Sequence, residues 1–174
     1  MKSLPALLEA LLLAAGEPVS RARLAEILGD EVSTSELDAA LQALKASYAE
    51  RGIELVEVAS GLRLQASERF APWLVKLYPQ RPPRYSRAVL ETLALIAWKQ
   101  PITRAEIEAI RGVSVNPVIL KTLTERGWVH SVGKRETPGR PELLATTTQF
   151  LDHFNLRTQD DLAEKLLPSE FTQT

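Results

Sequence analysis

An internal repeat constrains the fold of this chain more than any other feature. The 174 residues contain the same short segments twice, in the same order and at similar spacing. Because four matches in one order exceed what chance supplies, the chain is predicted to hold two copies of one small domain. The matching pairs are Leu8-Glu9-Ala10-Leu11 with Leu90-Glu91-Thr92-Leu93, Glu17–Ala22 with Gln100–Ala105, Leu24/Ile27/Gly29 with Ile107/Ile110/Gly112, and Arg51-Gly52 with Arg126-Gly127.

The first copy is predicted to begin with three helices. Apolar residues recur at helical spacing over residues 4–15, which predicts the first helix. Ser20 is expected to cap a short second helix. The third helix is expected over residues 35–50, with Ser35 and Asp38 at its start.

The second copy offers sharper signals for the same helices. Thr103 and Glu106 have the spacing of a capping box, which marks the start of its second helix. Asn116 followed by Pro117 predicts the start of the third, because these residue types are favoured at the N-cap and first helical positions. That helix is expected to end at Arg126.

Each copy is then predicted to end in a β-hairpin. Residues 53–59 and 62–66 flank Ser60-Gly61, a typical hairpin turn, and residues 128–132 and 142–147 flank a longer loop. Three helices followed by a two-stranded hairpin form the winged-helix plan. The predicted fold is therefore α+β, mainly α, with two tandem winged-helix domains.

The domain boundaries follow from composition. We expect an N-terminal winged-helix domain over residues 1–78, a Pro- and Arg-rich linker over 79–86, a C-terminal winged-helix domain over 87–157, and a short helix with a disordered tail over 158–174. No window reaches the roughly 18 apolar residues that a membrane-spanning helix needs, so no membrane partner is expected. Glu9 interrupts the leucine-rich start, which favours a core helix over a secretory signal.

The sequence lacks the motifs of the common catalytic sites. There is no cysteine, which excludes thiolate nucleophiles and Cys-based metal sites, and there is no glycine-rich phosphate loop. His130 and His153 lie in different predicted elements, and Asp160-Asp161 fits the first turn of a helix, where the helix dipole favours acids. We predict that the protein is not an enzyme and that it binds no cofactor or metal.

Winged helices commonly bind DNA through the third helix and the wing. The charge of these elements therefore indicates whether the partner is DNA or a protein. The formal net charge is −1, and Lys45 in the first copy's third helix is outnumbered by acids. We expect at most weak, non-specific phosphate contact, and we keep a DNA-binding transcriptional regulator as the alternative function. The basic residues that could make such contact lie in the linker and the second wing: Arg81, Arg84, Lys134, Arg135 and Arg140.

Two sets of apolar residues are candidates for protein contact. Only Glu9 is polar between Leu4 and Ala15, and a helix that is apolar nearly all round is buried on more than one side. We expect a subunit interface there, beside the alternative that this helix is central to its own domain. Aromatic residues of the second copy are candidate anchors for a partner segment, with the alternative that Phe150 and Phe154 are core. The candidates are Leu7, Leu11 and Leu13 for the interface and Trp98, Trp128, Phe150 and Phe154 for the anchors.

Several longer stretches resemble the segregation and condensation protein B (ScpB) family. They are residues 90–107 (LETLALIAWKQPITRAEI), Gly139-Arg140-Pro141-Glu142-Leu143 running into Thr146-Thr147, and residues 150–156. The resemblance extends from about residue 4 to residue 168. The chain departs from the family at Leu144, where an aromatic is common, and at Asn155, where glycine is usual; asparagine is the next best residue for a left-handed helix end.

The resemblance implies a non-catalytic subunit of a condensin-like complex. By this resemblance, the chain is expected to form homodimers of tandem winged-helix chains and to bind the kleisin ScpA, which bridges the heads of the SMC ATPase. ATP chemistry would then belong to SMC. The expected role is chromosome condensation and partition during cell division, in the cytoplasm on the nucleoid, with the second copy's aromatic residues contacting the kleisin.

Overall fold

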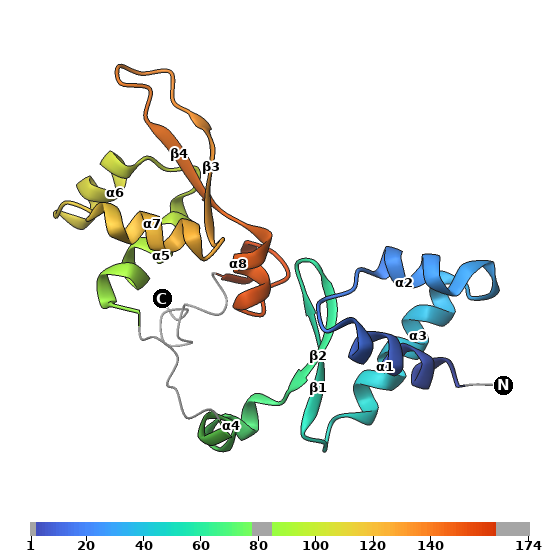
Figure 1. The fold of residues 1–174 in the computed structure, drawn as a ribbon. Coiled ribbons are helices and arrows are strands. Elements are labelled where there is room, and N and C mark those ends of the chain that lie inside the picture. Colours follow the sequence, from blue (N-terminus) through green and yellow to red (C-terminus); the bar gives the residue numbers. More distant parts are fainter. Residues whose placement is uncertain (1–2, 78–84, 163–174) are drawn as a thin grey trace, which may run out of the picture. The chain divides into compact units, whose positions relative to one another are not determined.

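The computed structural model describes residues 3–77 and 85–162, and the chain divides into two compact units, residues 1–82 and 83–174. Each unit holds three helices followed by an antiparallel hairpin (Figure 1). The predicted winged-helix fold class is confirmed. The first unit contains α1 (Leu4–Ala15), α2 (Arg21–Leu28), α3 (Thr34–Ser47), β1 (Ile53–Val58), β2 (Gly61–Ala66) and α4 (Ala71–Leu77), with 3-10 turns η1 (Gly29–Glu31) and η2 (Glu68–Phe70).

The second unit repeats this order with a different ending. Its elements are α5 (Arg87–Lys99), α6 (Arg104–Arg111), α7 (Pro117–Glu125), β3 (Val129–Lys134), β4 (Glu142–Thr146) and α8 (Thr148–His153). A further helical turn begins at residues 160–162. The remainder of the predicted tail and most of the predicted linker lie outside the described residues.

Hydrogen bonds at the helix starts explain where the helices begin. Ser20 Oγ accepts from the backbone of Arg23 at 3.1 Å, and Thr103 and Glu106 form the reciprocal capping box. Asn116 caps α7 through Val118, as expected. These three predictions are confirmed.

The start of α3 differs from the prediction. Ser33, and not Ser35 or Asp38, is the N-cap: its hydroxyl accepts from the Glu36 backbone, and the Glu36 carboxylate accepts from the Ser33 backbone at 2.8 Å. A capping box requires Glu or Gln three residues after the cap, and only Ser33 has that spacing here. Asp38 pairs instead with Arg21.

In each unit, one residue before the second helix forms an isolated β-bridge with the second strand of the hairpin. Val19 pairs with Leu62 in the first unit, and Ile102 pairs with Leu144 in the second. The two bridging residues fall at matched positions of the sequence repeat. This geometry requires glycine at position 61, because a Cβ there would lie 2.3 Å from the Val19 carbonyl oxygen and because the φ angle of Gly61 is +149°.

Burial corrects the repeat in the first helix of each unit. Leu8 is fully buried, but Leu90, its sequence match, is 47% exposed. When the two helices are aligned at their last residues, Ala15 with Lys99, the position equivalent to Leu8 is Thr92, which is also buried. The sequence match was two residues out of register because a Leu- and Ala-rich helix resembles itself at several offsets, and because the following connection is one residue longer in the first unit.

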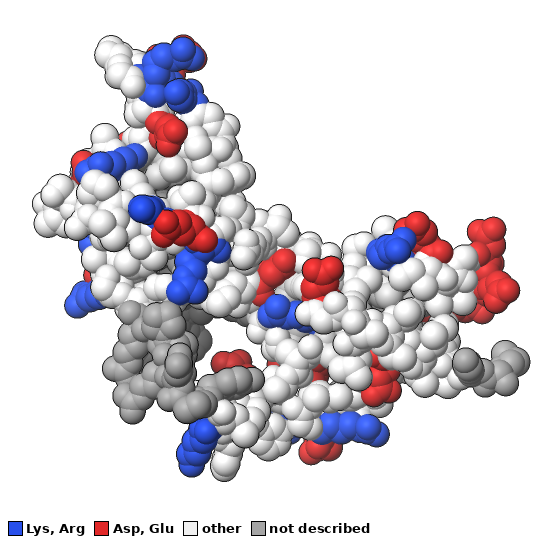
Figure 2. Space-filling model, viewed as in Figure 1, with Lys and Arg blue, Asp and Glu red and all other residues white. Residues whose placement is uncertain are grey.

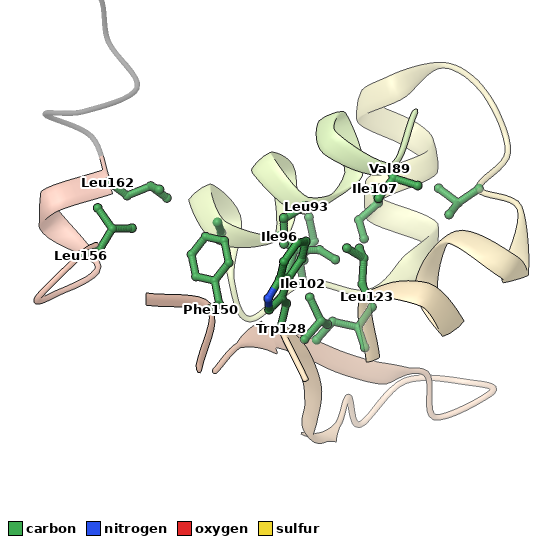
Figure 3. Close-up of a cluster of buried hydrophobic side chains, with 14 residues drawn as sticks. Val89, Leu93, Ile96, Ile102, Ile107, Leu123, Trp128, Phe150, Leu156 and Leu162 are labelled. Carbon is green, nitrogen blue, oxygen red and sulfur yellow. The ribbon is translucent and has the colours of Figure 1, made fainter. Parts of the chain in front are cut away.

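The second unit's core reaches beyond its hairpin. Leu156 and Leu162, which follow α8, join the same buried cluster as α5 and the strands (Figure 3). The side-chain amide of Gln159 donates to the Ala97 carbonyl of α5, which fixes this segment to the helix. Asn155 takes a positive φ of 54° at the end of α8, as expected for its position.

Candidate partner-binding surfaces

An aromatic cluster joins α8 to the start of the second hairpin. Trp128 lies with its ring centroid 5.1 Å from Tyr85, 4.7 Å from His153 and 5.4 Å from Phe154, and Phe150 lies 5.0 Å from Phe154. Such offset and tilted arrangements are favourable for aromatic rings. Trp98 lies on α5, and the ring contacts of this cluster do not include it.

Two of the four aromatic residues expected to contact a partner are core residues. Trp128 and Phe150 are each 3% exposed and belong to the buried cluster of the second unit (Figure 3). Side chains this deeply buried present almost no surface, so the expectation is corrected for both. Phe154 remains half-covered and Trp98 is 53% exposed, which leaves these two as candidate anchors.

Trp98 is part of an exposed apolar stripe along α5. Leu90, Ala94 and Trp98 are all exposed and are four residues apart, so they share one face of the helix. Large exposed apolar side chains grouped on one face are typical of protein contact surfaces. Sequence reasoning identified Trp98 but missed Leu90, because the repeat match equated Leu90 with a buried leucine.

The three leucines expected at a subunit interface differ in exposure. Leu11 is half-buried and packs against the first unit's core, whereas Leu7 is 38% exposed and Leu13 is 71% exposed. Ala10 and Ala14 beside Leu13 are exposed as well. The accessible face of α1 is therefore apolar and centred on Leu13.

A shallow groove of about 390 Å³ lies between the end of α1, α2 and the tip of the β1–β2 hairpin. Leu11, Val19, Leu24 and Ile27 contribute apolar lining, and Arg23 is among the polar lining residues. Arg23 is paired with Glu26 at 2.7 Å. The groove therefore combines apolar surface with two charged lining residues, Arg23 and the exposed Glu17.

Most of the candidate DNA-contacting cations in the described residues are paired with carboxylates. Arg135 lies 2.6 Å from Glu106, and Arg140 lies 3.1 Å from Glu136. Figure 2 shows Lys and Arg interspersed with Asp and Glu over this view of the chain. Arg81 and Arg84 lie outside the described residues, so among the predicted cations only Lys134 is without a carboxylate partner in the described part.

Glu106 links the second wing to α6. Its carboxylate accepts from the Thr103 backbone at 2.9 Å and from the Thr103 hydroxyl at 2.8 Å, and it pairs with Arg135. These interactions, led by the Thr103 backbone hydrogen bond, lower the pKa of Glu106 to about 2. The ionised Glu106 carboxylate therefore connects the start of α6 with the second wing.

Other site types find no support in the described residues. No three His, Cys, Asp or Glu side chains within residues 3–77 and 85–162 gather where they could hold a metal ion. No helix in the same ranges is long and apolar enough to cross a membrane.

Comparison with known proteins identifies the family. The family model of the segregation and condensation complex subunit ScpB matches residues 6–165. This chain belongs to the ScpB family. A segregation and condensation protein B homolog from Coxiella burnetii is 48% identical over 157 residues, covering 89% of this chain and 75% of that protein. ScpB of Moorella thermoacetica is 47% identical over 161 residues, covering 92% of this chain and 82% of its own.

Solved ScpB structures are also similar to this chain in sequence. ScpB from Mycobacterium tuberculosis shares 36% identity over 87% of this chain and 94% of its own, with a TM-score of 0.40. A dimer of a ScpB N-terminal domain complexed with ScpA peptide shares 36% identity over 47% of this chain and 99% of its own, with a TM-score of 0.42. The chain is thus a member of a chromosome segregation and condensation family, and none of these ScpB relatives is named for a catalytic activity.

Proposed function

We propose that this chain is a non-catalytic adaptor that binds the kleisin ScpA and, through it, the SMC ATPase. In this role it supports chromosome condensation and partition during cell division, in the cytoplasm on the nucleoid, and it acts as a homodimer joined through its first unit. The family's description as a subunit of a segregation and condensation complex supports an adaptor over an enzyme.

The observation that carries the proposal is where the exposed apolar side chains lie. Two winged-helix units expose apolar stripes on α1 and α5, while the second wing's arginines are paired with carboxylates. Phosphate contact needs available cations, whereas peptide contact needs accessible apolar anchors. The balance of these features favours a protein ligand.

ScpA binding is proposed mainly for the second unit. Trp98 on the α5 stripe and Phe154 at the end of α8 are the exposed aromatic side chains among the described residues of this unit. A kleisin segment that orders on binding would place apolar side chains against such anchors. Because aromatic residues often carry most of the binding energy of an interface, their loss should weaken binding strongly.

The test is ScpA binding by the full chain, measured by titration calorimetry. Trp98→Ala is expected to weaken binding at least tenfold without moving the melting temperature. Phe154→Ala is expected to weaken binding as strongly and also to lower the melting temperature, because its ring contacts with Trp128 and Phe150 are lost. Val118→Ala is the matched control, because Val118 is an exposed apolar residue on α7. Failure of the unaltered chain to bind ScpA would overturn the proposed function, and loss of binding only on α1 substitutions would move the site to the first unit.

A further inference from the structure

Three half-buried polar side chains meet where α5 ends in the second unit. They are Gln100, the C-cap of α5, Thr146, the last residue of β4, and Gln159, in the segment after α8. The Thr146 hydroxyl lies 2.8 Å from Oε1 of Gln100 and 3.3 Å from Oε1 of Gln159. The Thr146 backbone N–H also donates to Oε1 of Gln100. These three residues are called the polar network below, and each comes from a different element of the unit.

The polar network holds α5 at two points of its last turn. The final four carbonyl groups of a helix have no partner within the helix. Gln159 supplies a partner for one of them, because its side-chain amide donates to the Ala97 carbonyl. Gln100 fixes the other point, since its backbone N–H donates to the Ile96 carbonyl at 3.0 Å while its side chain accepts from Thr146. The path of the chain between Ala97 and Gln100 is therefore set from both sides.

Trp98 lies between these two points. Its side chain is 53% exposed, and among the described residues no aromatic ring pairs with it. An exposed ring that is not packed between other rings depends for its position on the backbone that carries it. The direction in which Trp98 leaves α5 thus depends on how the end of the helix is held.

The equivalent place in the first unit has neither the network nor the aromatic residue. When the two β-bridges are aligned, Leu64 takes the place of Thr146. A leucine side chain has no hydrogen-bonding group, and Leu64 packs against the apolar core of its unit. When the helix ends are aligned, α1 has Ala14 in the place of Trp98. The polar network therefore occurs together with the exposed tryptophan.

We propose that the polar network positions Trp98 for contact with ScpA, and that Gln159 is a positioning residue that acts through Ala97. ScpA contacts the tryptophan and not the network. Polar groups that are shielded from water and fully hydrogen-bonded hold one arrangement of their elements. An anchor that is held in place before binding has less conformational freedom to lose in the complex. This inference rests on the proposed function, because it assigns the residues that prepare the proposed anchor for its partner.

The test is a double-mutant cycle, measured by titration calorimetry of ScpA with the full chain. Gln159→Met keeps the length of the side chain and removes both of its hydrogen-bonding groups. It is introduced into the unaltered chain and into the Trp98→Ala chain. Thr122→Val is the control, because the Thr122 hydroxyl donates to the Val118 carbonyl at 2.8 Å within α7. The control thus loses a comparable hydrogen bond outside the polar network.

We expect Gln159→Met to weaken ScpA binding about fivefold or more in the unaltered chain and to have no further effect in the Trp98→Ala chain, because residues that act through one another are not additive. Thr122→Val should leave the affinity unchanged. Equal effects of Gln159→Met in both chains would overturn the inference and leave ScpA binding through Trp98 standing. If Trp98→Ala itself does not weaken binding, the proposed anchor is wrong and the inference fails with it.

Amide hydrogen exchange of the chain without ScpA separates a local effect from a general one. The Gln100 amide closes the last turn of α5, and the Leu93 amide lies in the middle of the same helix. In Gln159→Met, the Gln100 amide should exchange about tenfold faster while the Leu93 amide keeps its rate. Equal acceleration of both amides would mean that Gln159 only stabilises the unit, and would overturn the inference. Thr146→Val, which conserves side-chain shape, gives the same comparison if Gln159→Met does not fold.

Discussion

At the scale of single residues, Glu106 shows how one carboxylate can hold two elements together. It caps α6 through Thr103 and pairs with Arg135 of the second wing. Because its pKa is lowered to about 2, the folded state binds the proton more weakly than the unfolded chain does. Its contribution to stability is therefore fully present above pH 4.5 and is lost as the pH falls through about 2.

Glu106→Gln is accordingly expected to lower the melting temperature at pH 7 and to have progressively less effect between pH 4.5 and pH 2. Thermal melts of both proteins over that range check this. Glu125→Gln, at the exposed end of α7, is the control and should follow the unaltered protein throughout. A constant difference between Glu106→Gln and the unaltered protein down to the lowest pH would contradict the assignment.

Gly61 and Gly133 allow strain and steric clash to be separated. Their φ angles are +149° and +151°, but an added Cβ would meet the Val19 carbonyl at Gly61 and only open space at Gly133. Both alanine variants incur backbone strain of roughly 1–3 kcal/mol, and only Gly61→Ala also displaces the bridge. Urea unfolding should show the larger loss for Gly61→Ala, and equal losses would mean that the bridge contributes nothing.

At the scale of elements, local signals predicted more than tertiary ones. The caps at Ser20, Thr103 and Asn116 follow from side-chain hydrogen bonds within one turn, so the sequence contains them fully. The burial of Trp128 and Phe150 could not be predicted in this way, because it depends on the segment after α8 folding back on α5. The post-wing helix of the first unit was missed, since a short, mostly apolar segment without a clear period indicates no particular element.

The aromatic residues of the second unit give a prediction that separates core from surface. Phe150→Ala should cost about 3–5 kcal/mol of folding free energy because it leaves a cavity in a packed cluster. Trp98→Ala removes an exposed side chain and should change stability by no more than about 0.5 kcal/mol. Chemical denaturation of the two variants measures this directly. Equal costs would indicate that Trp98 is covered in the folded chain.

At the scale of the whole molecule, the two copies of one fold have diverged in how they complete their cores. The second unit is closed by its own chain through Leu156 and Leu162, whereas the first leaves Leu13 and α4 exposed. The hairpins differ as well: Ser67 lies five residues after the bridging Leu62, whereas Thr147 lies three residues after the bridging Leu144. Within the described residues, exposed apolar side chains therefore lie on α1 and α4 of the first unit and on the α5 stripe of the second.

The ion pairs of the second wing lead to a prediction about DNA binding. Arg135 and Arg140 are held by Glu106 and Glu136, so the second wing offers few cations for phosphate contact. Two unrelated duplexes should bind with equal, weak affinity that falls steeply between about 50 and 200 mM salt, because counterion release drives such binding. Fluorescence anisotropy checks this, with Lys134→Ala weakening the low-salt complex and Lys45→Ala of α3 leaving it unchanged. A nanomolar, sequence-selective complex at physiological salt would instead support a DNA-binding regulator, since selectivity requires base contacts that paired wing arginines do not provide.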